Sequence, residues 1–180
     1  MVKENPKKSK ASTIPKDNLK RKTVFARPNT DQSLTHLGIV GDTYTILLSG
    51  QDTDGRFCLI DMFVPPGGGP PPHRHDFEEM FTLLEGELAF TFRGKTLKVG
   101  AGSTINIPAN APHSFRNNSD KPVHMLCMCT PPGQEDYFLA VGDPLASRAT
   151  PPPRLNDAEI AERRQRALAL ASTFYTEFIT

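Results

Sequence analysis

Long apolar runs are missing from this 180-residue chain. The longest, around Leu59-Ile60 and Met62-Phe63-Val64, end within a few residues, whereas a membrane-spanning helix needs roughly 20 apolar residues in a row. The basic N-terminus is followed by no apolar stretch of the kind that signal peptides carry. These absences exclude a transmembrane helix and argue against secretion by that route, so we expect a cytoplasmic protein.

Cysteine is scarce, with only Cys58, Cys127 and Cys129 in the chain. An odd number of cysteines cannot all pair within one chain, and Cys127 and Cys129 alternate along a single predicted strand. We therefore expect three reduced thiols, mostly in the core, as is typical of a reducing compartment.

Net charge is also low, at +1, but it is unevenly distributed. Residues 1–30 carry nine Lys or Arg residues against Glu4 and Asp17, so this segment is basic and the remainder mildly acidic. The part from Met1 to Lys22 lacks both the aromatic residues that stack on bases and the apolar face of a membrane helix. We expect residues 1–30 to be a solvated, disordered tail, and we predict no nucleic acid and no membrane as partners.

Glycine (13 residues) and proline (17 residues) are abundant instead, and they divide the chain into short segments. Between Thr43 and Val141, β-rich runs alternate with turn residues, and we predict no helix there. Strands at this spacing indicate a sandwich or barrel, which we assign to residues 31–142. The predicted strands are Tyr44–Ser49, Phe57–Val64, Met80–Leu84, Glu87–Phe92, Thr96–Val99, Ser103–Ile107, His113–Arg116, Val123–Thr130 and Tyr137–Val141.

The last segment, residues 143–180, begins with a proline-rich linker and continues with a helical pattern from about Asp157 to Phe178. Asn156 or Asp157 can cap the start of this helix. An apolar stripe predicts that the helix packs on the barrel. The stripe consists of Ile160, Ala161, Ala167, Leu168 and Ala171.

Three histidines fall in two clusters, each of which looks like half of a metal site. His73 and His75 are two residues apart, so both rings face the same side of an extended strand. Glu79 lies about 13 Å further along a straight strand at ~3.3 Å per residue, so the chain must bend if Glu79 is to join them. His113 follows a break with two prolines and Asn110, a residue that tolerates the left-handed conformation, and such a turn can aim His113 into the barrel.

The same residues resemble the two sequence motifs of the cupin superfamily. The first motif is matched at Gly67, His73, His75, Glu79 and Gly86. The second is matched at Gly102, Pro108, His113 and Asn117. The one departure is Asn110, where the family usually has glycine, and asparagine is the next most tolerant residue at positive φ. The proline-rich sequence before His73 and the sequence Thr130-Pro131-Pro132-Gly133 also resemble the quercetin 2,3-dioxygenase-like group of single-domain bacterial cupins.

This resemblance implies an all-β fold, a double-stranded β-helix or jelly roll, with a C-terminal helical segment. It implies that His73, His75, Glu79 and His113 bind one divalent transition metal, for which Fe, Mn, Ni, Co, Cu and Zn are all chemically possible. Four ligands on an octahedral ion leave two positions for a substrate oxygen and dioxygen. The implied function is a metal-dependent dioxygenase, an oxidoreductase for a small aromatic or enolisable substrate, in which Glu79 also accepts the substrate proton.

Two other functions stay open. A non-redox isomerase, lyase or decarboxylase would use the ion only to polarise a carbonyl group, and a redox-capable ion as opposed to zinc would separate this class from the oxygenases. A small-molecule-binding cupin would use the same barrel without turnover. A cupin that has lost its metal and keeps the histidines as packed core groups is a further alternative to the metal site itself.

Residues an even number of positions from the ligands along a strand point to the same side as the ligands, and we expect them to line an apolar substrate pocket. Any small barrel also fills its interior with such side chains. These residues are Phe81, Leu83, Ile105, Ile107 and Phe115. Because no second cluster of His, Cys and carboxylate groups is evident, we expect one metal per chain. His36, placed in a loop, and His124, on a strand, are not predicted as ligands. A homodimer is expected, since the C-terminal helix can cover only part of a curved sheet.

Overall fold

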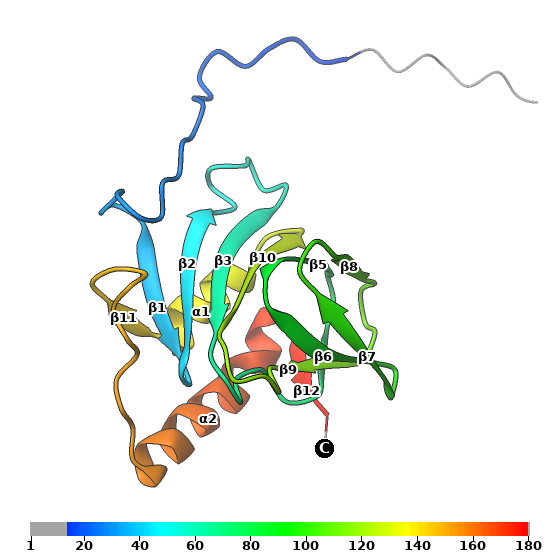
Figure 1. Cartoon of the computed structure of the whole chain (residues 1–180). Helices are drawn as coiled ribbons and strands as arrows, with labels where there is room; N and C mark the ends of the chain where they lie inside the picture. The colour runs from blue at the N-terminus through cyan, green and yellow to red at the C-terminus, as the bar shows by residue number, and fades with distance from the viewer. Residues whose placement is uncertain (1–13, 180) are drawn as a thin grey trace, which may run out of the picture.

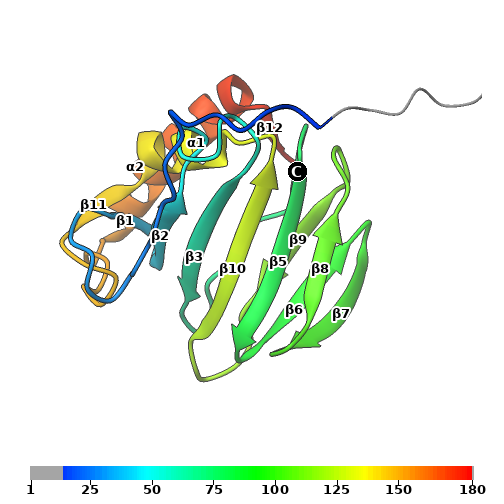
Figure 2. The ribbon, with the colours of Figure 1, turned by 90° about the horizontal axis from the view of Figure 1, so that it is seen from above.

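Two antiparallel sheets face each other and close into a barrel in the computed structural model, which describes residues 14–179 (Figures 1 and 2). This arrangement confirms the predicted jelly roll. One sheet has seven strands, in the order β11 (Asp143–Leu145), β1 (Thr35–Ile39), β2 (Asp42–Leu48), β3 (Cys58–Val64), β10 (Val123–Thr130), β5 (Glu78–Glu85) and β8 (Thr104–Ile107). The other has five, in the order β12 (Thr176–Phe178), β4 (His73–His75), β9 (His113–Arg116), β6 (Glu87–Phe92) and β7 (Lys95–Gly100).

The barrel interior follows from strict alternation along the central strands. On β10, residues Val123, Met125, Cys127 and Cys129 are fully buried, while the residues between them are partly exposed. Successive side chains of a strand point to opposite faces, so every second residue enters the core. The three cysteines are buried and unpaired, as predicted.

The bend that the sequence requires after His75 is present, and it carries the chain from one sheet to the other. β4 ends at His75 in the five-stranded sheet, and β5 begins at Glu78 in the seven-stranded sheet. Asn110 adopts the expected positive φ of 67°, and its backbone N–H donates a hydrogen bond to the carbonyl of His75 over 2.7 Å. The turn before β9 is thereby fastened to the end of β4.

The strand predicted at Tyr137–Val141 is wrong, as is the expected absence of helix before Val141. The chain instead forms the helix α1 (Gln134–Val141). Tyr137, Phe138 and Val141 are buried on one side of it, because Val141 is three residues from Phe138 and four from Tyr137, and residues at these spacings share a helix face. A run of five residues fits either period, and the acidic first turn before it favours the helix.

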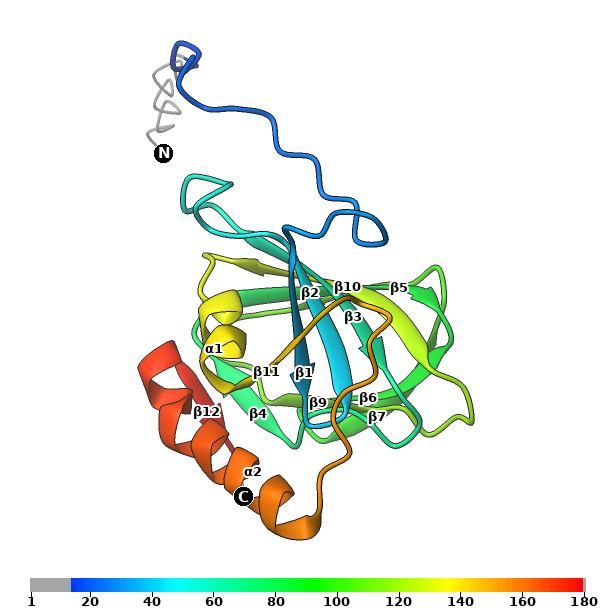
Figure 3. The ribbon, with the colours of Figure 1, turned by 90° about the vertical axis from the view of Figure 1, so that its left-hand side faces the viewer.

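The C-terminal helix ends earlier than predicted. α2 (Asp157–Ala171) is capped by Asn156, as expected, and is followed by the 3₁₀ turn η1 (Ser172–Phe174) and then by β12, which pairs with β4. α2 packs mainly on α1 and β12, on one side of the barrel (Figure 3). Leu168, placed in the apolar stripe, is 56% exposed. Ala161 is exposed as well, so the stripe that packs on the protein is narrower than predicted.

Two predictions concern the N-terminal part of the chain: the disordered tail, which stays a prediction, and the placement of His36 in a loop, which is wrong. Of the expected disordered tail, residues 1–13 lie outside the described residues, and residues 14–34 contain no helix or strand (Figure 1). His36 lies on β1 and not in a loop, where it is buried and its Nδ1 is 2.8 Å from Thr45 Oγ1. Among the described residues, no helix is long and apolar enough to cross a membrane.

Candidate metal centre

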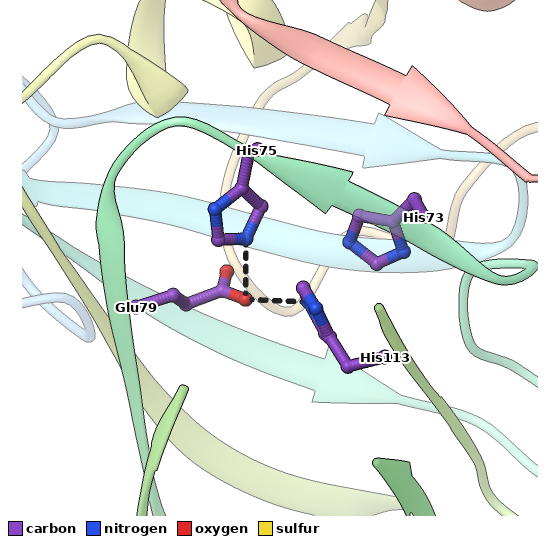
Figure 4. A group of neighbouring side chains, drawn as sticks. All are labelled: His73, His75, Glu79 and His113. Carbon is purple, nitrogen blue, oxygen red and sulfur yellow. Dashed lines mark hydrogen bonds and ion pairs between the residues drawn. The ribbon is translucent and has the colours of Figure 1, made fainter. Parts of the chain in front are cut away.

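Four buried side chains from both sheets meet inside the barrel (Figure 4). His73 and His75 come from β4, His113 from the neighbouring β9, and Glu79 from β5 of the opposite sheet. One potential ligand atom from each lies within 4.8 Å of all the others. The structure therefore brings together the four residues that the sequence motifs indicate.

Backbone carbonyls fix the orientation of all three imidazole rings. Nδ1 of His73 is 2.9 Å from the Pro71 oxygen, Nδ1 of His75 is 3.0 Å from the Phe77 oxygen, and Nδ1 of His113 is 2.9 Å from a third carbonyl, that of the alanine two residues before it. Because a carbonyl only accepts hydrogen bonds, each Nδ1 must carry the hydrogen. A ring with its single hydrogen on Nδ1 presents the lone pair of Nε2 to the interior, which is the arrangement that metal-binding histidines use.

The position of Glu79 is the observation that tests whether a cation fits. Its Oε2 lies 3.1 Å from Nε2 of His75 and 3.1 Å from Nε2 of His113. A carboxylate oxygen and a neutral Nε2 both carry lone pairs, so this approach is unfavourable unless a cation or added protons lie between them. Three imidazoles and one carboxylate suit a divalent first-row transition ion.

The pKa shifts of His73 and Glu79 favour the protonation states in which these residues can bind a metal ion. Burial, followed by the charge of His113, lowers the pKa of His73 to about 4, so this ring is neutral at neutral pH. Burial alone would raise the pKa of the Glu79 carboxyl, but in the metal-free protein added protons on Nε2 of His113 and of His75 would donate hydrogen bonds to the carboxylate, and these hold that pKa below its usual range. Metal binding needs neutral imidazole and ionised carboxylate, and both shifts favour these states.

A second group of potential ligands adjoins the first, so the expectation that no such cluster exists is wrong. The thiols of Cys127 and Cys129 on β10 contact Oε1 of Glu79, the oxygen that does not contact the imidazoles, and the three residues form a buried set. A hydrogen bond from Cys129 lowers the pKa of Cys127, but burial and the Glu79 charge outweigh it and raise it to about 12. In the sequence, the only sign of this group was that Cys127 and Cys129 are two residues apart and so point to the same face of a strand. Their distance from Glu79 depends on the pairing of β5 with β10, which the sequence pattern does not give.

The residues predicted to line the pocket pack as barrel core. Phe81, Leu83, Ile107 and Phe115 are almost fully buried, and Ile105 is partly buried. The rings of Phe81 and Phe115 meet edge to face, with 5.4 Å between their centroids. Their contact with a substrate stays a prediction.

A polar hollow of about 370 Å³ borders His75 near β12, and the sequence did not indicate it. It is lined by Arg74, Asp76, Asn110 and Tyr175 among others. Two of the lining residues are hydrogen-bonded to each other, since Nδ2 of Asn110 donates to Oδ1 of Asp76 over 3.0 Å. The lining combines segments from β4, the turn before β9 and the C-terminal end of the chain, which only the folded structure brings together.

Comparisons with known proteins agree with this architecture. The family model described as "Cupin domain" matches residues 60–129. Quercetin 2,3-dioxygenase of Bacillus subtilis (strain 168) is 29% identical over 115 residues, which cover 63% of this chain and 34% of that protein. Auxin-binding protein 1 of Arabidopsis thaliana is 30% identical over 142 residues, covering 71% of this chain and 63% of that protein. The chain thus spans less than two thirds of the length of both relatives.

A solved structure from Thermotoga maritima, described as a predicted oxalate decarboxylase, is also similar. Its TM-score is 0.52 at 21% sequence identity, and the match covers 60% of this chain and 99% of that one. At this level of identity the likeness concerns the fold.

Proposed function

We propose that this chain, which belongs to the cupin superfamily, is a metal-dependent dioxygenase acting on a small aromatic or enolisable molecule. The observation that carries the proposal is the convergence of three Nε2 lone pairs and one carboxylate oxygen in the barrel interior. The similarity to the Bacillus quercetin 2,3-dioxygenase supports oxygenation in particular. Because that similarity covers part of each protein, substrate and reaction are matters for experiment.

In this proposal one divalent transition ion is held by His73, His75, Glu79 and His113. Such an ion supplies acidification of a substrate hydroxyl group and redox chemistry with dioxygen. Glu79 then has a second role, because the oxygen that faces the imidazoles can accept the substrate proton. The buried rings of Phe81 and Phe115 stand two residues along their strands from Glu79 and His113, and they add apolar surface to the barrel interior.

A binding protein without turnover is the second candidate, and the similarity to Auxin-binding protein 1 favours it. The same four residues would then hold the ion as an anchor for an acidic small molecule. The two candidates share their metal and differ in whether dioxygen is consumed.

The test begins with metal analysis of protein purified without chelators, followed by oxygen-consumption assays with flavonols, diketones and catechols. We expect a redox-capable ion and oxygen uptake with at least one substrate class, both lost in His113→Ala. His124→Gln is the matched control, because that histidine lies outside the metal-ligand group and the glutamine amide can still donate to Asp61, which His124 contacts at 2.6 Å. Full metal content without oxygen uptake would favour the binding protein, and full metal content in His113→Ala would refute the site.

A further inference from the structure

The two carboxylate oxygens of Glu79 face chemically different groups. Oε2 lies 3.1 Å from Nε2 of His75 and 3.1 Å from Nε2 of His113, the two contacts drawn as dashed lines in Figure 4. Oε1 is 3.3 Å from Sγ of Cys127 and 3.9 Å from Sγ of Cys129, and the two sulfur atoms are 3.7 Å apart. All three side chains are nearly or fully buried, and neither thiol has a role in the proposed dioxygenase chemistry.

The spacing of these three donor atoms matches one face of a tetrahedral metal site. With Zn–S distances of about 2.3 Å and a Zn–O distance of about 2.1 Å, tetrahedral angles place two sulfur ligands about 3.8 Å apart. The same angles place a sulfur about 3.6 Å from an oxygen ligand. The observed separations of 3.3, 3.7 and 3.9 Å fall within a few tenths of an ångström of these values.

Charge balance allows a cation at this point despite the burial. When one divalent ion binds two thiols, two S–H bonds break, two S–metal bonds form and two protons leave to solvent. The net charge of the barrel interior is therefore unchanged, and the electrostatic cost of burying an unpaired charge does not arise. Two sulfur donors select thiophilic ions, whereas three imidazoles accept most first-row ions.

We propose that Glu79, Cys127 and Cys129 form a second cation site, for a thiophilic divalent ion such as Zn²⁺, at Oε1 of Glu79, the carboxylate oxygen that does not contact the imidazoles. Glu79 then bridges two cations, one held by nitrogen and one held by sulfur. The inference goes beyond the proposed function, because it requires neither a substrate nor dioxygen.

Cadmium is the probe, since sulfur-to-cadmium charge transfer absorbs in the ultraviolet. The full chain, reduced and freed of metal by a chelator, is titrated with Cd²⁺, and bound ions are counted by equilibrium dialysis. We expect two Cd²⁺ per chain and a charge-transfer band in the wild-type protein. The Cys127→Ala/Cys129→Ala variant should bind one Cd²⁺ and lack the band.

Two further variants separate the sites. His73→Ala/His113→Ala should keep the band while losing the other ion, and Cys127→Ala alone should weaken the sulfur site by about 100-fold or more. The loss of a partner one shell further out already costs about 10–100-fold, so the loss of a ligand must cost at least as much. Cys58→Ala is the matched control and should keep the band, because Cys58 is a buried thiol opposite Cys129 but outside the Glu79 group.

A wild-type protein without the band would overturn the second site. A band that survives in Cys127→Ala/Cys129→Ala, or that disappears in Cys58→Ala, would overturn its assignment to these donors. If the alanine variant fails to fold, Cys127→Ser/Cys129→Ser preserves side-chain size and must also lose the band. Failure of the proposed dioxygenase appears separately, as missing oxygen uptake with the band intact.

Discussion

Replacing Glu79 by glutamine separates metal binding from the stability of the metal-free barrel. The outward hydrogen bonds of the imidazoles leave Nε2 of His75 and of His113 as lone pairs, each 3.1 Å from Oε2. A glutamine amide nitrogen at the Oε2 position carries two hydrogens and can donate one to each ring. The amide oxygen at the Oε1 position keeps the hydrogen bond from Cys127. An unfavourable contact in the metal-free protein thus becomes two hydrogen bonds.

The expected gain follows from these two bonds. At about 0.5–1.5 kcal/mol net for each, the free energy of unfolding of metal-free Glu79→Gln should rise by about 1–3 kcal/mol. For a chain of this size 1 kcal/mol corresponds to about 2–4 °C, so the melting temperature should rise by roughly 2–12 °C. Loss of the negative charge should weaken metal binding at the same time. Turnover per bound metal should fall by about 10²–10⁴-fold if Glu79 is also the proton acceptor.

The assay is thermal unfolding followed by circular dichroism, in excess chelator at about pH 8.5, above the ordinary imidazole pKa of about 6.5. Glu79→Asp is the control, since it keeps the charge, shortens the side chain and adds no donor, and it should not raise the melting temperature. A metal-free Glu79→Gln protein that melts at or below the wild type would show that Nε2 does not present its lone pair to Glu79. Metal affinity equal to that of the wild type would remove Glu79 from the ligand set.

The remaining predictions concern the imidazoles, three ion pairs made by two carboxylates, the protonation of Asp42 and the oligomeric state. His73→Ala and His113→Ala should each lose the transition ion of the nitrogen site, and elemental analysis that finds it at full occupancy in both would refute the site. Asp61→Ala removes a buried carboxylate that pairs with His124 at 2.6 Å and Arg148 at 2.8 Å, and it should lower the free energy of unfolding in urea by about 3–5 kcal/mol. Glu177→Ala breaks an exposed ion pair with Arg74 and should lower it by about 0–1 kcal/mol. Equal losses in the two variants would contradict this prediction. Burial raises the pKa of Asp42 from 3.8 to about 7, so between these values the native state holds a proton that the unfolded chain has lost. The contribution of Asp42 to the free energy of unfolding should therefore fall as pH rises from about 4 to about 7. If the urea midpoint changes with pH in Asp42→Asn as steeply as in the wild type, the prediction is wrong. Light scattering should give the mass of a homodimer, and a mass near the 19.8 kDa of one chain would refute that expectation.

Strand spacing along the chain predicted a sandwich or barrel, and the resemblance to the cupin motifs implied the four residues that meet inside it. Strand alternation has a period of two, so the inward parity of His73, His75 and Glu79 is a property of the local sequence. The need for a bend between His75 and Glu79 followed from distance alone. The tolerance of Asn110 for positive φ is likewise intrinsic to that residue.

Pairings between distant segments, by contrast, were decided only in the folded structure. The last residues of the predicted helix form β12 because the exposed edge of β4 offers backbone hydrogen-bonding groups that a strand can satisfy. The contact of Glu79 with Cys127 and Cys129 depends on the register of β5 against β10, which no local period encodes. The sequence by itself therefore determined which side chains enter the barrel, and the tertiary structure decided which of them touch, because contact across sheets depends on long-range pairing.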